Sequence, residues 1–448
     1  MRIKKQIKVF IGPHEIAGYY SNLSKGLQSI GVRADFITFQ SHPFGYGGET
    51  KLPLILKAMR WVNKFRGKQG RSRPVRFLYA LPGEILSAVW ALVTILSYDV
   101  FIFGFGRTLL RNNYDLKLLK LFRKRVICNL GHGSDARPPF IDGGYQSKQG
   151  KRPTIEETYR LTILTRKIVD RHFKYASVVL GAPYSTSQYA PSKFINHFSI
   201  GIPFDRDDLK KIENQKDPIA IRERHSVRVL HAPSHAAAKG SPLISSAIKR
   251  LKDKGYAIDF ILIEGRPVAE VFEEIIKCDL VVDQIYSDTP MAGFATEAAF
   301  HGKPVIVGGY GFDKLRSFVP VEMWPPSITS NPNQFEQAIE EMVSNVNQCE
   351  RLGKAAQVFV REKWSPTEVG KRYMRLINDD IPESWWVEPK EIAYLHGAGQ
   401  SEETSREIIR EMVSTYGEDS LQLSHRPDLH AAFLKFAGMG DRNRQENA

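Results

Sequence analysis

The feature that most constrains this chain is the alternation of short apolar runs with segments of helical periodicity. Apolar runs of strand length recur from residues 7–11 (IKVFI) to 176–183, and the alternation resumes over 227–308 after the charged stretch 205–218. Short connections between alternating elements are typical of parallel sheets covered by helices. The sequence therefore predicts an α/β protein with two Rossmann-like, doubly wound domains that face each other across a ligand cleft.

A length of 448 residues agrees with more than one domain. We expect a first domain over 1–205, a linker over 206–224 and a second domain over 225–378. A mostly helical tail follows over 379–448. Packing on the body, self-association and a loose arrangement all stay open for this tail.

Charge divides unevenly between the two halves of the chain. Residues 1–205 hold 32 Lys and Arg against 12 Asp and Glu, whereas residues 206–448 hold 31 against 37. The densest basic segment, 51–76, has nine cations and no acid, with apolar residues between them. This pattern favours peripheral contact with an anionic membrane, although a solvated basic loop stays open. Nucleic acid is not expected as a partner, because no recognition-helix, RNP or zinc-finger pattern occurs.

The cysteines and the longest apolar run bear on where the protein works. Cys128, Cys278 and Cys349 lie far apart without metal-ligand spacing, which indicates reduced thiols in a cytoplasmic protein. No N-terminal segment resembles a signal peptide. The run 85–97 has 13 residues, fewer than the roughly 20 that a membrane span needs. We predict a buried helix there, with contact to lipid as the alternative.

A candidate anion site follows the strand-like run 227–231. The loop after it ends in Lys239 and Gly240, and a helical pattern comes next. Ser241 is a good N-cap residue and Pro242 suits the first helical turn. The lysine and glycine are therefore predicted on a strand-to-helix turn, where free N–H groups and the helix dipole favour an anion.

The stretch 287–311 carries a second candidate. Glu297 is predicted on a helix that follows the small residues Ala292 and Gly293. Small residues let a ligand approach the backbone, and a nearby carboxylate can accept hydrogen bonds from the two hydroxyl groups of a ribose. Together with Lys239, these residues predict a site for a nucleotide diphosphate.

These residues resemble the donor-binding half of GT-B glycosyltransferases of the family-4 type. The resemblance consists of a strand, His-x-Pro, a loop that ends in Lys-Gly, a helix and later GFATEAAFHGKPVI. It is good over about 225–378, weaker over 1–205 and does not reach the tail. It implies a GT-B fold in which 1–205 is the acceptor-side domain and 225–378 binds the nucleotide sugar. It also implies a retaining, metal-independent transfer that needs no cofactor besides the nucleotide-diphosphate sugar, which is the donor substrate.

The resemblance assigns roles to individual residues of the donor side. Glu297 matches the second glutamate of the family's Glu, seven residues, Glu motif and would hold the ribose. Lys239 matches the lysine that neutralises the diphosphate, with Gly240 and Gly293 beside the same ligand.

Two positions depart from the family pattern. Thr289 stands where the first glutamate of the motif is expected, with Asp288 beside it. Ser234 stands where the family often has an arginine, a charge that Arg266 would replace.

The acceptor side is represented by residues 129–140 (NLGHGSDARPPF). His132 lies between two glycines, and Asp135 follows at the end of a strand, where doubly wound sheets bind ligands. By the resemblance, His132 is the candidate catalytic histidine and Asp135 is a second catalytic candidate. The structural alternatives are that His132 is only a turn residue and that Asp135 only caps the following turn.

We therefore expect a cytoplasmic glycosyltransferase that moves a sugar to a glycan or polyprenyl-linked acceptor at the inner face of a membrane, in cell-envelope polysaccharide biosynthesis. Two alternatives stay open. Thr289 is compatible with a non-catalytic nucleotide-sugar-binding protein of the same fold. A nucleotide-sugar epimerase has a similar two-lobed design.

Overall fold

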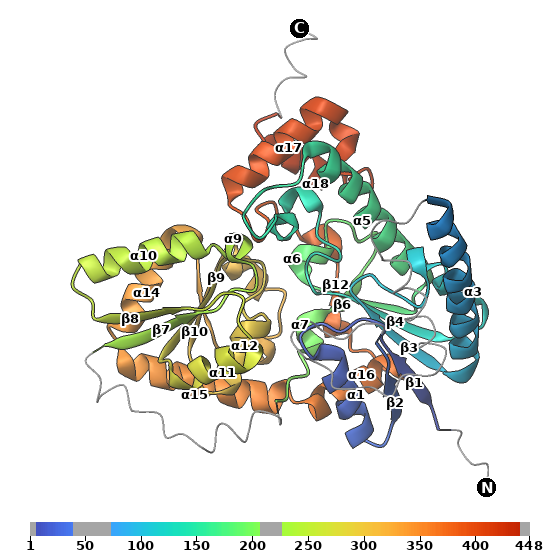
Figure 1. The fold of residues 1–448 in the computed structure, drawn as a ribbon, viewed down its shortest axis with the longest axis horizontal. Helices are drawn as coiled ribbons and strands as arrows, with labels where there is room; N and C mark the ends of the chain where they lie inside the picture. Colours follow the sequence, from blue (N-terminus) through green and yellow to red (C-terminus); the bar gives the residue numbers. More distant parts are fainter. Residues whose placement is uncertain (1–5, 39–72, 207–225, 440–448) are drawn as a thin grey trace.

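Two α/β domains and a helical C-terminal segment make up the protein in this computed structural model, which describes residues 6–38, 73–206 and 226–439 (Figure 1). The predicted fold class, with two Rossmann-like domains and a mostly helical tail, is confirmed. The basic segment 51–76 lies outside the described residues except for its last four positions, which begin helix α3 (Arg73–Ser97). The predicted linker 206–224 also lies outside them except for Arg206.

The first domain is built on a seven-stranded sheet in the order β12-β6-β5-β4-β3-β1-β2. All its strand pairs are parallel except the edge pair of β12 with β6. Besides α3, its elements up to residue 200 are β1 (Lys8–Ile11), α1 (Tyr19–Ser29), β2 (Arg33–Phe36), β3 (Val100–Gly104), α4 (Asp115–Leu121), β4 (Arg125–Leu130), α5 (Ile155–Tyr175), β5 (Val178–Gly181), α6 (Pro183–Thr186), β6 (Phe194–Asn196) and α7 (His197–Ile200).

The central strands of this sheet are buried on both faces, which explains their nearly continuous apolar sequences. Helices α3 and α4 cover the face that carries Phe10 and Phe101. Helix α1 covers the opposite face, which carries Ile11 and Ile102.

The second domain has a five-stranded parallel sheet in the order β11-β10-β9-β7-β8. From β7 onward this is the 2-1-3-4-5 order of doubly wound sheets, with its topological switch between β7 and β9. Its elements are β7 (Val227–His231), α9 (Ala236–Lys239), α10 (Ser241–Asp253), β8 (Ile258–Leu262), α11 (Val268–Lys277), β9 (Leu280–Ser287), α12 (Gly293–Phe300), β10 (Val305–Gly309), α13 (Phe312–Arg316), β11 (Ile328–Ser330), α14 (Phe335–Val343) and α15 (Val346–Lys363).

Helix α16 (Pro366–Ile377) corrects the predicted boundary at 378. Although it falls within the predicted second domain, it packs on α1 of the first (Figure 1). Two glycines permit this close approach, because a Cβ atom on Gly26 would lie 1.8 Å from the Pro366 carbonyl oxygen and one on Gly370 would lie 2.8 Å from the Gly26 backbone. The chain therefore returns to the first domain before the tail begins.

The tail packs on the first domain, which settles one of the alternatives left open for it. Strand β12 (Trp386–Val387) extends the first sheet, and helices α17 (Glu402–Tyr416) and α18 (Pro427–Phe436) follow. Tyr416 stacks on Tyr159 of α5 with ring centroids 4.5 Å apart, and Phe433 meets Phe140 edge-on at 5.4 Å. Residues 440–448 are not among those described.

The prediction that 85–97 is a buried helix holds for one side of α3 only. Trp90, Ala91 and Ile95 are buried against the sheet, whereas Leu92 and Leu96 are 49% and 62% exposed. Among the described helices, none combines the length and the apolar character needed to cross a bilayer. The three cysteines are buried and unpaired, as expected for reduced thiols.

Candidate functional site

A cavity of about 170 Å³ lies between the two domains. The first domain contributes the loops that follow β1, β4, β5 and β6, and the second contributes the loop that follows β9. The carboxyl ends of parallel strands are where doubly wound sheets bind ligands. The cavity is lined by Ile16, Ala17, Tyr19, Gly131, His132, Gly133, Ala182, Ser185, His197, Phe198, Ile202, Phe204, Asp288, Thr289, Met291, Ala292 and Gly293.

His132 lies on the first-domain wall within a cluster of rings. Its Nε2 atom is 2.8 Å from the Tyr20 hydroxyl, and its ring meets those of Tyr19 and His197 at centroid distances of 5.2 and 5.8 Å. Burial lowers the pKa of His132 from 6.5 to about 3, and that of His197 to about 4. Both imidazoles are therefore neutral at pH 7, and the structure places the predicted His132 in the cavity wall.

Asp135 lies behind His132 and is not among the cavity-lining residues. Its Oδ2 atom accepts a long hydrogen bond of 3.4 Å from the His132 N–H, whereas its Oδ1 atom is buried without a hydrogen-bond partner in the described part of the chain. Burial raises the pKa of this carboxyl to about 7. Asp135 thus supports the turn that carries His132.

The second-domain wall is the N-terminus of α12. The cap residue, Ala292, provides no side-chain hydrogen bond, so the amide groups of the first helical turn remain open to a ligand. A Cβ atom on Gly293 would lie 3.7 Å from the Ala17 Cβ of the first domain. Small residues thus bring the two domains close together beside an uncapped helix N-terminus, an arrangement suited to an anion.

A buried ion pair joins the domains beside the cavity. The Arg137 guanidinium lies 2.5 Å from the Asp288 carboxylate and 3.1 Å from that of Asp142. All three side chains are at most 10% exposed. Asp288 stands beside Thr289 in the sequence, but no local pattern indicated that it would pair with Arg137 across the domains.

Lys239 is held by two side chains in the middle of β9. Its Nζ atom donates to Gln284 Oε1 at 2.7 Å and lies 3.4 Å from Asp283 Oδ1. Gln284 Nε2 then donates to the Ser287 hydroxyl, which donates to the Thr289 carbonyl oxygen, each at 2.8 Å. A chain of hydrogen bonds therefore links Lys239 to the loop that lines the cavity, although Lys239 itself does not line it.

The turn before α10 differs from the predicted one. Residues 236–239 form the short helix α9, and the N–H groups of Lys239 and Gly240 donate to carbonyl oxygens within that turn. Gly240, with a φ of 74°, is the N-cap of α10, and Ser241 is not. The Ser241 hydroxyl instead lies 2.8 Å from Nε2 of the buried His231. The His231 Nδ1–H donates to the Val282 carbonyl oxygen, so Nε2 is the acceptor and the Ser241 hydroxyl is the donor.

The other predicted donor residues lie apart from the cavity wall. Glu297, on α12, lies 3.3 Å from the Arg206 guanidinium, with both side chains 12% exposed. Arg266 follows β8, is 66% exposed and lies 4.0 Å from Glu270. Lys239 and Glu297 thus have different partners, so their convergence on one ligand stays a prediction.

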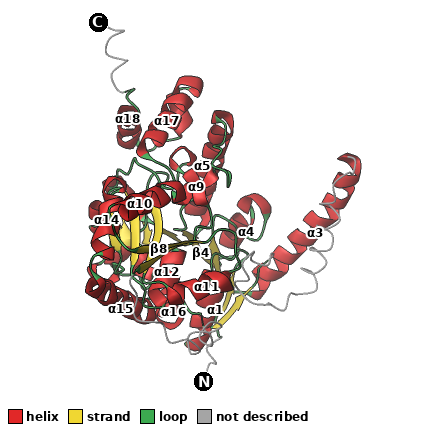
Figure 2. Ribbon diagram, turned by 60° about the vertical axis from the view of Figure 1, so that its left-hand side comes forward, coloured by secondary structure: helices red, strands yellow, loops and turns green. Residues whose placement is uncertain are grey.

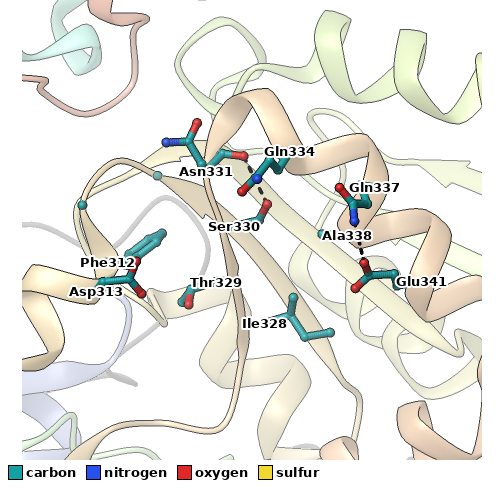
Figure 3. Close-up of a pocket in the computed structure, with 12 residues that line it drawn as sticks. Phe312, Asp313, Ile328, Thr329, Ser330, Asn331, Gln334, Gln337, Ala338 and Glu341 are labelled. Carbon is teal, nitrogen blue, oxygen red and sulfur yellow. Dashed lines mark hydrogen bonds between the residues drawn. The ribbon is translucent and has the colours of Figure 1, made fainter.

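Larger hollows also occur on the surface. One of about 340 Å³ lies at the carboxyl ends of β10 and β11, and Figure 3 shows its polar side chains coming from α13, β11, the turn after β11 and α14. Another of about 900 Å³ lies along α5. Neither is lined by any of the predicted site residues, so the smaller cavity between the domains is the candidate site.

The tail also bridges the two domains. The Ala398 N–H donates to the Ile141 carbonyl oxygen of the first domain at 3.0 Å. The Gly399 N–H donates to the Tyr286 carbonyl oxygen of the second domain at 2.8 Å. The Glu402 N–H donates to the Tyr310 hydroxyl at 3.2 Å. Through these three hydrogen bonds, residues 398–402 connect the two domains, and we call this segment the strap. The sequence did not predict this connection.

Comparisons with known proteins give structural similarity only. No family model matches the chain, and no curated protein matches it. Similar solved structures include Anabaena HepE in complex with UDP-glucose (12% identity, TM-score 0.43, 83% of this chain and 100% of that one) and an alpha-glucosyltransferase in complex with UDP-glucose and DNA (12%, 0.47, 83% and 99%). A putative UDP-N-acetylglucosamine 2-epimerase from Listeria monocytogenes is also similar (11%, 0.40, 84% and 98%). Likeness at this level does not fix an activity.

Proposed function

We propose that the protein is a glycosyltransferase that moves a sugar from a nucleotide-diphosphate sugar to a hydroxyl acceptor. The observation that carries the proposal is the cavity at the carboxyl ends of both sheets, where the neutral His132 faces the uncapped N-terminus of α12. Amide groups at a helix N-terminus suit a diphosphate, and a neutral imidazole suits hydrogen bonding to a sugar hydroxyl. The diphosphate of the donor would therefore contact the α12 wall, and its sugar would contact the His132 wall.

The proposed reaction is a retaining transfer without a metal ion. The bond between the anomeric carbon and the diphosphate oxygen breaks, the acceptor oxygen bonds to the same carbon, and the acceptor proton passes to the leaving diphosphate. Lys239 and the α12 amides would stabilise the charge that develops on that leaving group. With a pKa of about 3, His132 is a weak base, so its role is to orient a hydroxyl group.

Donor binding would require a change in the spacing of the two domains. The cavity of about 170 Å³ is smaller than the roughly 300 Å³ of the smallest typical ligand sites. Separation of the domains would admit the nucleotide and free Glu297 from Arg206 to accept the ribose hydroxyls. The Arg137–Asp288 pair and the strap would oppose this movement.

The acceptor class follows from the charge of the first domain. Its excess of cations suits a glycan or polyprenyl-linked acceptor at the inner face of a membrane, with the protein in the cytoplasm. Cell-envelope polysaccharide synthesis is the corresponding process.

A second candidate is a nucleotide-sugar-binding protein without turnover. Position 289 is threonine, and the neighbouring carboxylate of Asp288 is occupied by Arg137. Neither group is then available to hold the donor sugar in the way that a free glutamate would.

Calorimetry with UDP and GDP, followed by incubation with radiolabelled nucleotide sugars and membrane extract, tests these candidates. Transfer of label, with the anomeric configuration of the product assigned by NMR, would support the glycosyltransferase. Binding without transfer would support the second candidate, and a changed sugar on the nucleotide would indicate an epimerase. Lys239→Ala and Glu297→Gln should each weaken nucleotide binding at least about tenfold, whereas Lys354→Ala on α15 should not. Unchanged affinity in both variants would refute the assignment of the donor site.

A further inference from the structure

Helix α3 has an unusual outer face. Between residues 85 and 97 it contains no charged side chain, yet one side of it faces solvent. Five large apolar side chains on that side are 46–62% exposed, at the i, i+4, i+7, i+8 and i+11 spacing of a single stripe: Ile85, Val89, Leu92, Val93 and Leu96. A surface helix normally has polar residues on its outer side. A contiguous apolar patch of this kind marks an interaction site.

The position of α3 makes this stripe accessible. The helix has 25 residues and is therefore about 37 Å long, whereas β3 with five residues spans about 17 Å. Only two residues separate the end of α3 from the start of β3, so the helix runs antiparallel to the strand. Because the helix is longer than the strand, its N-terminal part extends toward the carboxyl end of the sheet, where His132 lies. Figure 2 shows α3 projecting from the side of the molecule.

Cations and further apolar residues occur on the neighbouring helix. Helix α4 covers the same sheet face as α3. Leu118 and Leu121 on this helix and Phe122 directly after it are 40%, 74% and 44% exposed. Lys124 follows α4 and donates to the Tyr98 carbonyl oxygen at 2.7 Å, directly after the end of α3. Lys117, Lys120 and Arg123 belong to the same segment. Apolar side chains beside cations are the pattern of a helix that lies in an anionic membrane surface.

We propose that the outer face of α3, with the exposed end of α4, binds the surface of an anionic lipid bilayer. The apolar stripe enters the boundary between headgroups and acyl chains, and the cations contact lipid phosphates. The large excess of Lys and Arg over Asp and Glu in residues 1–205 favours this occupant over a second copy of the same basic surface, which would be repelled. The proposal does not depend on sugar transfer, since it concerns only where the protein binds.

Co-sedimentation of the full chain with vesicles tests the proposal. The protein should bind vesicles of phosphatidylglycerol and phosphatidylcholine, and bind pure phosphatidylcholine vesicles more weakly. Val93→Asp/Leu96→Asp should reduce binding to the anionic vesicles at least about tenfold. Val321→Asp, at a 79% exposed position of the second domain, is the matched control and should bind like the unmodified protein. Circular dichroism and UDP binding should be the same in all variants.

A dye at position 89 separates the possible occupants. The three native cysteines are buried, so Val89→Cys can be labelled selectively with a polarity-sensitive fluorophore. Its emission should be that of an aqueous environment in solution and shift to the blue on anionic vesicles. An apolar signal without vesicles would show that another segment or a second copy covers the face, and would overturn the proposal. Absence of vesicle binding, or equal binding by the double variant, would overturn it as well.

Discussion

The Arg137 guanidinium of the first domain lies 2.5 Å from the Asp288 carboxylate of the second, and both groups are buried. Breaking a buried ion pair by removing one partner leaves an uncompensated charge, which typically costs about 3–5 kcal/mol. Arg137 also pairs with Asp142, so loss of the arginine leaves two buried carboxylates without a partner. Loss of Asp288 still leaves Arg137 paired with Asp142.

Arg137→Gln should therefore lower the free energy of unfolding by about 3 kcal/mol or more, and Asp288→Asn should lower it by less. Urea denaturation measures both values. Lys193→Gln, which removes an exposed pair with Glu383, is the control and should change stability by less than about 1 kcal/mol. Equal effects of Arg137→Gln and Lys193→Gln would contradict the role of the interdomain pair.

Lys239 has a structural role that must be separated from its proposed role in binding. It lies beside Asp283, which is 1% exposed and whose Oδ2 atom has no hydrogen-bond partner among the described residues. Lys239→Met should therefore destabilise the fold, and Asp283→Asn in the same chain should restore stability. If Lys239 also neutralises a diphosphate, UDP affinity measured by calorimetry stays reduced in the double variant. Recovery of affinity together with stability would show that the lysine acts only through Asp283.

Gly240 is required by both conformation and space. Its φ is 74°, and an added Cβ would lie 2.1 Å from the Ile285 Cγ2 atom. Gly255 also has a positive φ, of 98°, but no atom lies within 4 Å of its added Cβ. Gly240→Ala should lower stability by about 2–4 kcal/mol and Gly255→Ala by only about 1 kcal/mol, as thermal or urea unfolding would measure. Equal losses would mean that Ile285 moves aside freely.

Stability should fall in mild acid because buried histidines stay neutral in the fold. The pKa of His132 is lowered from 6.5 to about 3 and that of His197 to about 4. Below pH 6.5 the unfolded chain binds protons that the folded chain does not, so stability is complete above pH 6.5 and is lost as pH falls toward 4. Each group contributes about 1.4 kcal/mol per pH unit in this range.

Unfolding free energies measured between pH 7.5 and 4.5 test this expectation. His197→Gln should reduce the slope of stability against pH. The raised pKa of Asp135, about 7, acts in the opposite direction, since its proton stabilises the folded state below pH 7. Asp135→Asn should therefore steepen the loss of stability in acid, and a flatter profile in that variant would contradict the assignment.

The sequence by itself determined the two doubly wound domains and most elements within them, because hydrophobic periodicity and caps are local. Helix α5 begins with a capping box in which the Thr154 hydroxyl accepts from the Glu157 N–H at 3.1 Å, and two residue types three positions apart encode this pattern. The loop of His132 and the small residues around Gly293 were identified as ligand-facing from the sequence, and the tertiary structure places them on opposite walls of one cavity.

Only the tertiary structure decided which distant residues meet. The return of α16 to α1, the strap at 398–402 and the pairing of Arg137 with Asp288 join segments more than ninety residues apart, and no local pattern encodes such contacts. The outer side of α3 shows the same limit, because an apolar run looks identical in sequence whether one face or both are covered. Burial depends on what packs against a helix, and that is a property of the whole chain.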